Sequence, residues 1–101
     1  MYVNVFRSRK RAELNTEAYA ADGARMEALA RQQKGFIAYR RYVAPDGESL
    51  SMSEWETEAD ARAWARNAEH AAVQERGRAA YYESYVVYSC SDPTIRRFNA
   101  K

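Results

Sequence analysis

The stretch from Phe36 to Glu56 constrains the fold most, because it alternates, turns and alternates again. Side chains from Phe36 to Val43 alternate between two faces, as in a β-strand. A Pro-Asp-Gly turn follows at residues 45–47, where proline presets φ and Asp-Gly tolerates the positive φ that comes next. From Leu50 to Glu56 the strand pattern resumes. Two strands joined by such a turn predict an antiparallel hairpin.

A strand and a helix are predicted before this hairpin. Residues Tyr2 to Ser8 are rich in β-branched and aromatic side chains and predict a strand. From about Asn15 to Gln33 the apolar residues recur every three or four positions, which predicts an amphipathic helix. Asn15 or Thr16 can cap its first turn. Lys34-Gly35 supplies a glycine stop at its end.

A second helical region is predicted after the hairpin. Residues 57–60, Thr-Glu-Ala-Asp, match a capping box, in which a threonine and an acid three residues later satisfy the first free amides of a helix. The apolar stripe loosens around Asn67. A second, short helix is predicted over residues 69–76, with Gly77 as its stop.

The last predicted element is the strand from Ala80 to Cys90, which is apolar or aromatic on both faces and is stopped by Asp92-Pro93. A tail over residues 92–101 carries Ile95 and Phe98. These two side chains are expected to dock the tail on a partner chain.

The order strand, helix, hairpin, helix, strand predicts an α+β fold with a ferredoxin-like βαββαβ protomer. Its four-stranded antiparallel sheet would carry both helices on one face. The 101 residues form one domain, 1–101, and a chain of this size has a thin core. Because the strands are apolar on both faces, we expect the open sheet face to bury against a second copy in a symmetric homodimer.

Charge and composition exclude several classes of partner. The 16 basic and 14 acidic residues are scattered and give a net charge of +2, so no basic block predicts a nucleic-acid partner. No apolar run approaches the roughly 18 residues of a membrane span, and the single cysteine, Cys90, forms no intrachain disulfide. We expect a soluble, cytoplasmic protein. No zinc-type Cys/His cluster, phosphate loop or serine elbow is found, so no metal is predicted.

Several motifs in this order resemble the antibiotic biosynthesis monooxygenase domain, a family of small dimeric α+β-barrel proteins with a ferredoxin-like protomer. The motifs that carry the resemblance cover nearly the whole chain. They are Tyr2-Val3-Asn4-Val5-Phe6-Arg7-Ser8, Ala30-Arg31-Gln32-Gln33-Lys34-Gly35-Phe36, Glu54-Trp55-Glu56-Thr57, Trp64, Glu69-His70-Ala71-Ala72-Val73-Gln74, Gly77-Arg78 and Tyr81-Tyr82-Glu83-Ser84-Tyr85.

The resemblance implies oxidation of a small aromatic compound, such as a quinol or an anthrone, by oxygen without a cofactor. Such a reaction needs an apolar pocket, a few hydrogen-bond donors and a way to stabilise the substrate anion. His70 is the only side chain with an unperturbed pKa near neutrality and is the candidate catalytic base, although a histidine at a helix junction also serves as a cap or surface residue. The candidate substrate-binding residues are Asn4, Phe6, Trp55, Trp64, Arg78 and Tyr82.

Each of these residues also has an ordinary structural role. Trp55 and Trp64 fit a hydrophobic core equally well. Arg78 can satisfy the carbonyls of the preceding helix or bridge a dimer, and tyrosines such as Tyr82 are common at interfaces.

Two alternative functions remain open from the sequence. Haem-degrading members of the family hold iron with a histidine on the short helix and place an asparagine on the first strand. Trp64 matches their tryptophan, but Gln74 occupies the histidine position and Phe6 the asparagine position, with His70 one helical turn away. The other alternative is a non-catalytic dimeric binding or stress-response domain whose aromatic residues are all core and interface.

Overall fold

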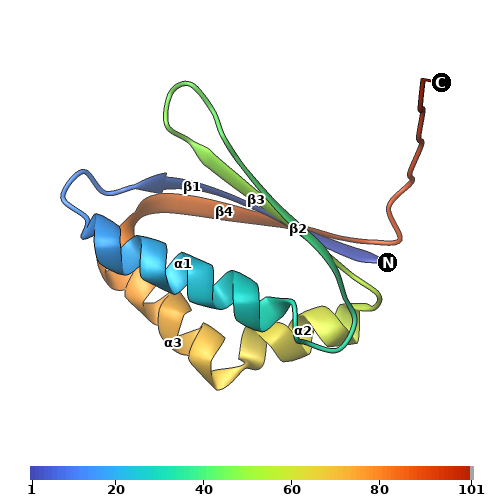
Figure 1. Ribbon diagram of the computed structural model, residues 1–101, viewed down its shortest axis with the longest axis horizontal. Helices are drawn as coiled ribbons and strands as arrows, with labels where there is room; N and C mark the ends of the chain where they lie inside the picture. Colours follow the sequence, from blue (N-terminus) through green and yellow to red (C-terminus); the bar gives the residue numbers. More distant parts are fainter. Residues whose placement is uncertain (101) are drawn as a thin grey trace.

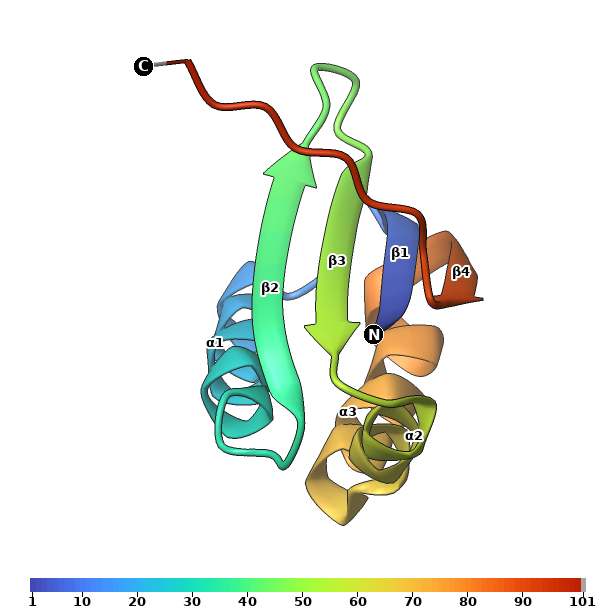
Figure 2. The same ribbon diagram turned by 90° about the vertical axis from the view of Figure 1, so that its right-hand side faces the viewer.

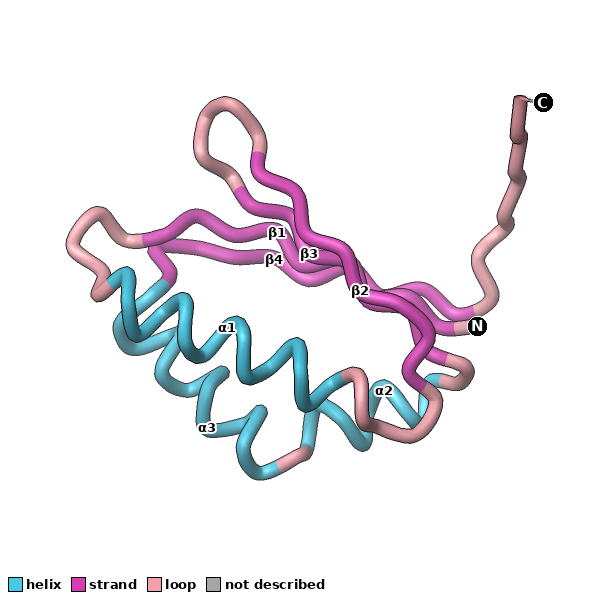
Figure 3. The backbone as a smooth tube through the Cα atoms, in the orientation of Figure 1, coloured by secondary structure: helices cyan, strands magenta, loops and turns pink. Residues whose placement is uncertain are grey.

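The computed structural model describes residues 1–100 and consists of one sheet covered by helices on one side (Figure 1, Figure 3). The four strands are all antiparallel and lie in the order β2-β3-β1-β4. The elements are β1 (Tyr2–Lys10), α1 (Thr16–Ala30), β2 (Phe36–Val43), β3 (Ser49–Trp55), α2 (Glu58–Arg66), α3 (Ala68–Arg76), the π-helical turn η1 (Gly77–Tyr81) and β4 (Tyr82–Ser91). The predicted ferredoxin-like α+β fold is confirmed.

The predicted hairpin forms between β2 and β3, with Val43 paired to Ser49. Its turn is closed by a hydrogen bond from the Gly47 amide to the Ala44 carbonyl, 2.9 Å long. Gly47 has a φ of 91°, a left-handed conformation that glycine adopts without steric cost. The alternation and the turn residues therefore encode this hairpin locally.

Helix α1 begins as predicted and ends earlier than predicted. The Asn15 side chain accepts a hydrogen bond from the Ala18 amide at 2.9 Å, which is an N-cap. The helix ends at Ala30, three residues before the predicted end, and the chain then turns to Gly35, which has a φ of 81°. A Cβ at Gly35 would collide with the Asp60 side chain, so both conformation and space require glycine here.

The second helical region breaks where the sequence predicted, at Asn67. The Asn67 side chain accepts hydrogen bonds from the amides of Glu69 and His70 and thereby starts α3. α3 ends at Arg76 with Gly77 as its C-cap, as predicted, but Gly77 has a helical φ of −58° and the chain continues through the π-helical turn η1, which the sequence did not predict. A Cβ at Gly77 would lie 2.8 Å from the ring of Tyr82. The glycine therefore makes room for an aromatic ring, and β4 begins at Tyr82, two residues later than predicted.

The sheet has an inner face toward the helices and an outer face away from them. Figure 2 shows α1 on the β2 side of the inner face and α2 and α3 nearer β1. The buried core lies at one end of this layer, where fully buried Trp55 packs with Ala30, Ala61 and Trp64. Among the described residues, no helix is long and apolar enough to cross a membrane.

The outer face carries large apolar side chains in contact with solvent. Tyr42, Val86 and Tyr88 are 59%, 42% and 53% exposed. Beyond β4 the chain leaves the sheet on the side away from the helices (Figure 1), and Phe98 in this segment is 89% exposed. The predicted tail ends at Lys101, which lies outside the described residues, and its docking on a partner chain stays a prediction.

Candidate active site

The inner face of the sheet is polar at its centre, although helices cover it. Along β3 the inner side chains are Ser49, Ser51 and Ser53, whereas Leu50 and Met52 point to the outer face. In a sheet that helices cover on one face, the strands normally place their apolar side chains on that face. We call these three serines the serine row. Their reversed pattern places hydroxyl groups, rather than apolar side chains, between the sheet and the helices.

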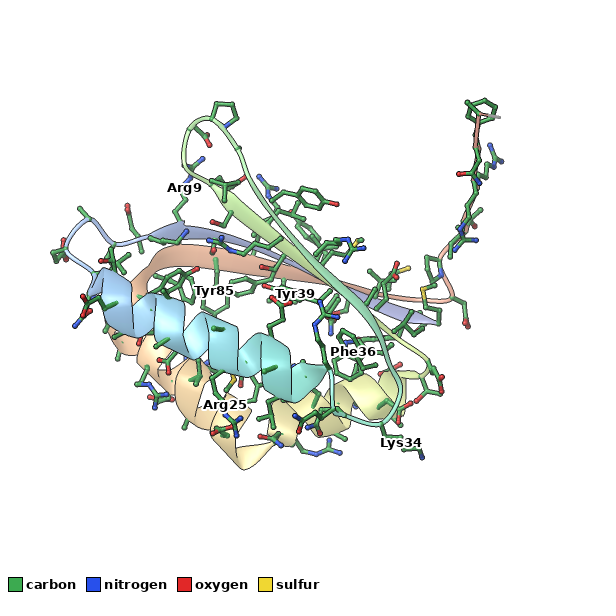
Figure 4. All side chains as sticks on the ribbon, viewed as in Figure 1. Arg9, Arg25, Lys34, Phe36, Tyr39 and Tyr85 are labelled. Carbon is green, nitrogen blue, oxygen red and sulfur yellow. The ribbon has the colours of Figure 1, made fainter. Side chains whose placement is uncertain are left out.

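Each hydroxyl of the serine row accepts a hydrogen bond from a neighbouring side chain. Trp55 Nε1 donates to Ser53 Oγ at 3.0 Å, and the Tyr39 hydroxyl donates to Ser51 Oγ at 3.2 Å. A serine oxygen that accepts such a bond can still offer its own proton. The row therefore presents hydroxyl donors on the helix side of the sheet, where Figure 4 also shows Tyr39 and Tyr85.

Asn4 joins the polar centre from β1. It lies opposite Ser53 on one side and opposite Ser89 on the other, and its Oδ1 accepts a hydrogen bond from Ser89 Oγ at 2.5 Å. The sequence singled out Asn4 but missed the serine row. The signal that could have found it is the alternation of serines with Leu50 and Met52 next to Trp55.

One end of the inner face holds Trp55, Trp64 and His70 in a continuous stack. The rings of Trp55 and Trp64 lie 6.3 Å apart, and the rings of Trp64 and His70 lie 4.1 Å apart with an interplanar angle of 15°. Trp55 is 0% exposed and Trp64 is 8% exposed. Both tryptophans thus have the core role that their spacing also allowed, and through them His70 connects to Ser53.

Two hydrogen bonds, one to its backbone amide and one to its ring, hold His70 in one orientation. Its amide bonds to the Asn67 side chain, and its Nδ1 lies 3.0 Å from the Trp64 carbonyl oxygen. Because a carbonyl only accepts, Nδ1 carries the proton and Nε2 keeps its lone pair. Burial lowers the pKa of His70 below its ordinary value, against a smaller opposing effect of the Trp64 carbonyl. The ring is therefore neutral at physiological pH and can accept a proton at Nε2.

Acidification should destabilise the protein through His70. The unfolded ring takes up a proton near its ordinary pKa of 6.5, whereas the folded ring does so only at lower pH. His70 thus contributes stability that is present above this pH and is lost as the pH falls through the window below it. Glu69 beside it is paired with Arg25. We expect the melting temperature to fall as the pH is lowered from about 7.5 to about 5, and to fall less in His70→Gln. An equal fall of the melting temperature in both proteins would contradict this role.

The other end of the inner face is a cluster of aromatic rings from three elements. Phe6 contacts Tyr82 and Tyr85 at ring distances of 5.3 and 5.1 Å, and Tyr19 of α1 lies 6.1 Å from Tyr82. Burial, followed by the neighbouring Tyr19 phenol, raises the pKa of Tyr82, so its hydroxyl stays protonated and can donate a hydrogen bond. Phe6 and Tyr82 therefore lie together on the inner face.

Arg78 is an exposed residue of η1 at the rim of this aromatic cluster. Its guanidinium pairs with Glu75 at 2.8 Å, and its backbone carbonyl accepts a hydrogen bond from Arg11. Hydrogen bonds to Tyr85 and Glu75 raise the pKa of Arg78. Two hollows of about 240 Å³ each, one over β1 and β4 near Glu48 and one beside Met1, are lined by none of the candidate site residues.

Comparison with known proteins identifies the family. The sequence profile described as "Antibiotic biosynthesis monooxygenase" matches residues 1–76. The chain belongs to the antibiotic biosynthesis monooxygenase family. The uncharacterized protein YqjZ from Bacillus subtilis is 34% identical over 73 residues. This match covers 72% of the chain and 64% of the Bacillus protein.

Solved structures share the fold of this family member at low sequence identity. Rv0793 from Mycobacterium tuberculosis superposes with a TM-score of 0.80 at 13% identity, covering 95% of this chain and 98% of the other. SnoaB, a cofactor-independent oxygenase from Streptomyces nogalater whose structure is that of an N63A mutant, superposes with a TM-score of 0.76 at 14% identity, covering 95% and 97%. At these identities the neighbours show a shared fold.

Proposed function

We propose that this protein is a cofactor-independent monooxygenase that oxidises a small quinol-like or anthrone-like aromatic with oxygen. The observation that carries the proposal is the inner face itself. A hydroxyl-bearing centre lies between two aromatic clusters, and the stack at one end leads to a neutral histidine with a free Nε2. The aromatic side chains would contact the ring faces of such a substrate, and the hydroxyl donors would bind its oxygens.

The reaction with an anthrone can be written from these groups. His70 Nε2 accepts one proton from the central CH₂ group, which requires the Trp64 ring that stacks on His70 to move aside. The hydroxyl donors of Ser51, Ser53 and Tyr82 stabilise the resulting anion. The anion gives one electron to O₂, and the radical pair combines to a peroxide at that carbon. The peroxide takes up the proton held by His70. It then loses water, which is formed from its outer oxygen, that proton and the second hydrogen of the central carbon. One oxygen atom remains as the new carbonyl and the other leaves as water.

Oxygen uptake with a panel of anthrones and quinols tests this function. We expect turnover by the purified protein without added metal, flavin or haem. His70→Gln should lower kcat/KM by about a hundredfold, because a positioned general base contributes at least that factor. Gln74→Ala is the matched control, since Gln74 is an exposed residue of the same helix and should leave kcat/KM unchanged.

The two other functions suggested by the sequence appear as distinct outcomes. Oxygen uptake that requires hemin, together with a shifted Soret band, would replace the proposal by haem degradation. No turnover across the panel, with or without hemin, would favour a non-catalytic binding domain. Turnover unchanged in His70→Gln would remove the base from the mechanism.

The outer face supports the expectation of a homodimer, which is part of the same proposal. Tyr42, Val86 and Tyr88 expose apolar surface on the sheet side that the helices leave uncovered. A second copy would bury these side chains against their equivalents about a twofold axis. In such a dimer each inner face keeps its own site, because the helices and the partner lie on opposite sides of the sheet.

A further inference from the structure

Two positively charged side chains meet on one oxygen at the tyrosine end of the inner face. Lys10 Nζ donates to Ser49 Oγ at 2.7 Å, and Arg41 Nη2 donates to the same oxygen at 3.2 Å. Ser49 is only 2% exposed. Strand pairing produces this arrangement, because β3 lies between β1 and β2 and brings residues far apart in the sequence to one hydroxyl.

The two charges have no acidic partner within the structure. Over residues 1–100, no carboxylate lies within 4.0 Å of Lys10 or Arg41. The contrast with the outer face is direct, since Arg7 and Arg9 of the same strand as Lys10 pair with Glu48 and Asp46. Two like charges beside one neutral oxygen repel each other. An anion would relieve this repulsion.

Phenol groups complete the surroundings of the two cations. The Tyr19 hydroxyl accepts from Arg41 at 3.5 Å, and Lys10 lies 5.1 Å from the centre of the Tyr19 ring. The charge of Arg41 lowers the pKa of Tyr82, but burial and the Tyr19 phenol outweigh this effect, so the Tyr82 hydroxyl stays protonated. Arg41 is exposed at the edge of this group, so a ligand can reach it from solvent. The group combines two cations with hydroxyl donors, which is the chemistry that binds an anionic oxygen.

We propose that Lys10 and Arg41 form an anion subsite that binds a carboxylate or phenolate oxygen of the aromatic substrate. This inference rests on the proposed function, because it assumes that the inner face is the substrate site. The ring system would extend from Lys10 and Arg41 along the serine row, past Phe6 and toward Trp55. The substrate class is thus narrowed to aromatic compounds that carry a negatively charged oxygen.

Binding of compounds that need not be oxidised tests the subsite. By isothermal titration calorimetry, 2-naphthoate should bind at least about tenfold more tightly than the neutral 2-naphthalenemethanol, since charge-assisted hydrogen bonds exceed neutral ones. Lys10→Met and Arg41→Gln should each weaken 2-naphthoate binding about tenfold. Arg40→Gln is the matched control, because it removes the same charge from the outer face of the same strand and should have no effect.

A phenol distinguishes the two sources of negative charge. The absorbance of 4-nitrophenol reports its ionisation, and the subsite should lower the pKa of the bound phenol in the wild type but not in Arg41→Gln. Tight binding of 2-naphthoate without this shift assigns the subsite to carboxylates. The shift without tight 2-naphthoate binding assigns it to phenolates.

Other outcomes would overturn the subsite. Equal affinity of the wild type for 2-naphthoate and 2-naphthalenemethanol, with no shift for 4-nitrophenol, removes it, as does an Arg40→Gln loss equal to that of Arg41→Gln. If circular dichroism shows that Arg41→Gln does not fold, Arg41→Lys and the salt dependence of 2-naphthoate binding by the wild type replace it. An affinity for 2-naphthoate that does not change with salt concentration counts against the subsite. Anion binding without any turnover leaves the subsite standing while the oxygenase function fails, and turnover without anion preference does the reverse.

Discussion

Replacing Trp55 with alanine should lower the free energy of unfolding by about 3–5 kcal/mol, the range for removing a large buried aromatic side chain. Trp55 is 0% exposed and packs between Phe36 and Trp64, with ring distances of 5.7 and 6.3 Å. A domain of this size has a total stability of about 5–15 kcal/mol. The loss would therefore leave a substantial unfolded fraction. Urea denaturation followed by circular dichroism measures it.

The control for this substitution is Trp55→Phe. Phenylalanine keeps an aromatic ring in the core but loses the hydrogen bond from Nε1 to Ser53 Oγ. We expect a loss of about 1–2 kcal/mol, from one hydrogen bond and a smaller volume. A loss below about 1 kcal/mol in Trp55→Ala would mean that the core tolerates this cavity, and that Trp55 is free to serve a ligand instead.

The fold could be predicted because its signals are local. Alternation and a turn encode the hairpin of β2 and β3, Asn15 caps α1, and Asn67 separates α2 from α3. The continuation of the helical backbone past Gly77 was not predicted, for a tertiary reason. The residue is glycine because the Tyr82 ring occupies the space of a Cβ, and no local pattern records that contact.

The site was predictable only in part, because the same spacing serves core and pocket. Helical and strand periodicity could not tell whether Trp64 is packed or offered to a ligand, and its 8% exposure decides for packing. The meeting of Lys10 and Arg41 on Ser49 depends on the register of three strands. The sequence showed the alternation of serines but not that the helices would cover the polar face.

Placing a charge on the outer face should convert the proposed dimer into monomers. Val86 is 42% exposed and lies opposite Arg7 on the outer side of β4. In a twofold dimer Val86→Glu acts twice, and each buried carboxylate costs several kcal/mol. We therefore expect the dissociation constant of the dimer to rise about a thousandfold or more. Light scattering should show a change from twice 11.6 kDa to 11.6 kDa.

Ala72→Glu is the control for this experiment, because Ala72 is exposed on α3, away from the sheet. It should leave the dimer intact. A monomeric wild type, or a dimer that survives Val86→Glu, would contradict the interface. The Val86→Glu monomer also separates assembly from ligand binding. The serine row and Lys10 lie on the inner face of the sheet and His70 lies on α3 of the same chain. The folded monomer should therefore still bind 2-naphthoate, and a loss of that binding would mean that the partner helps to shape the site.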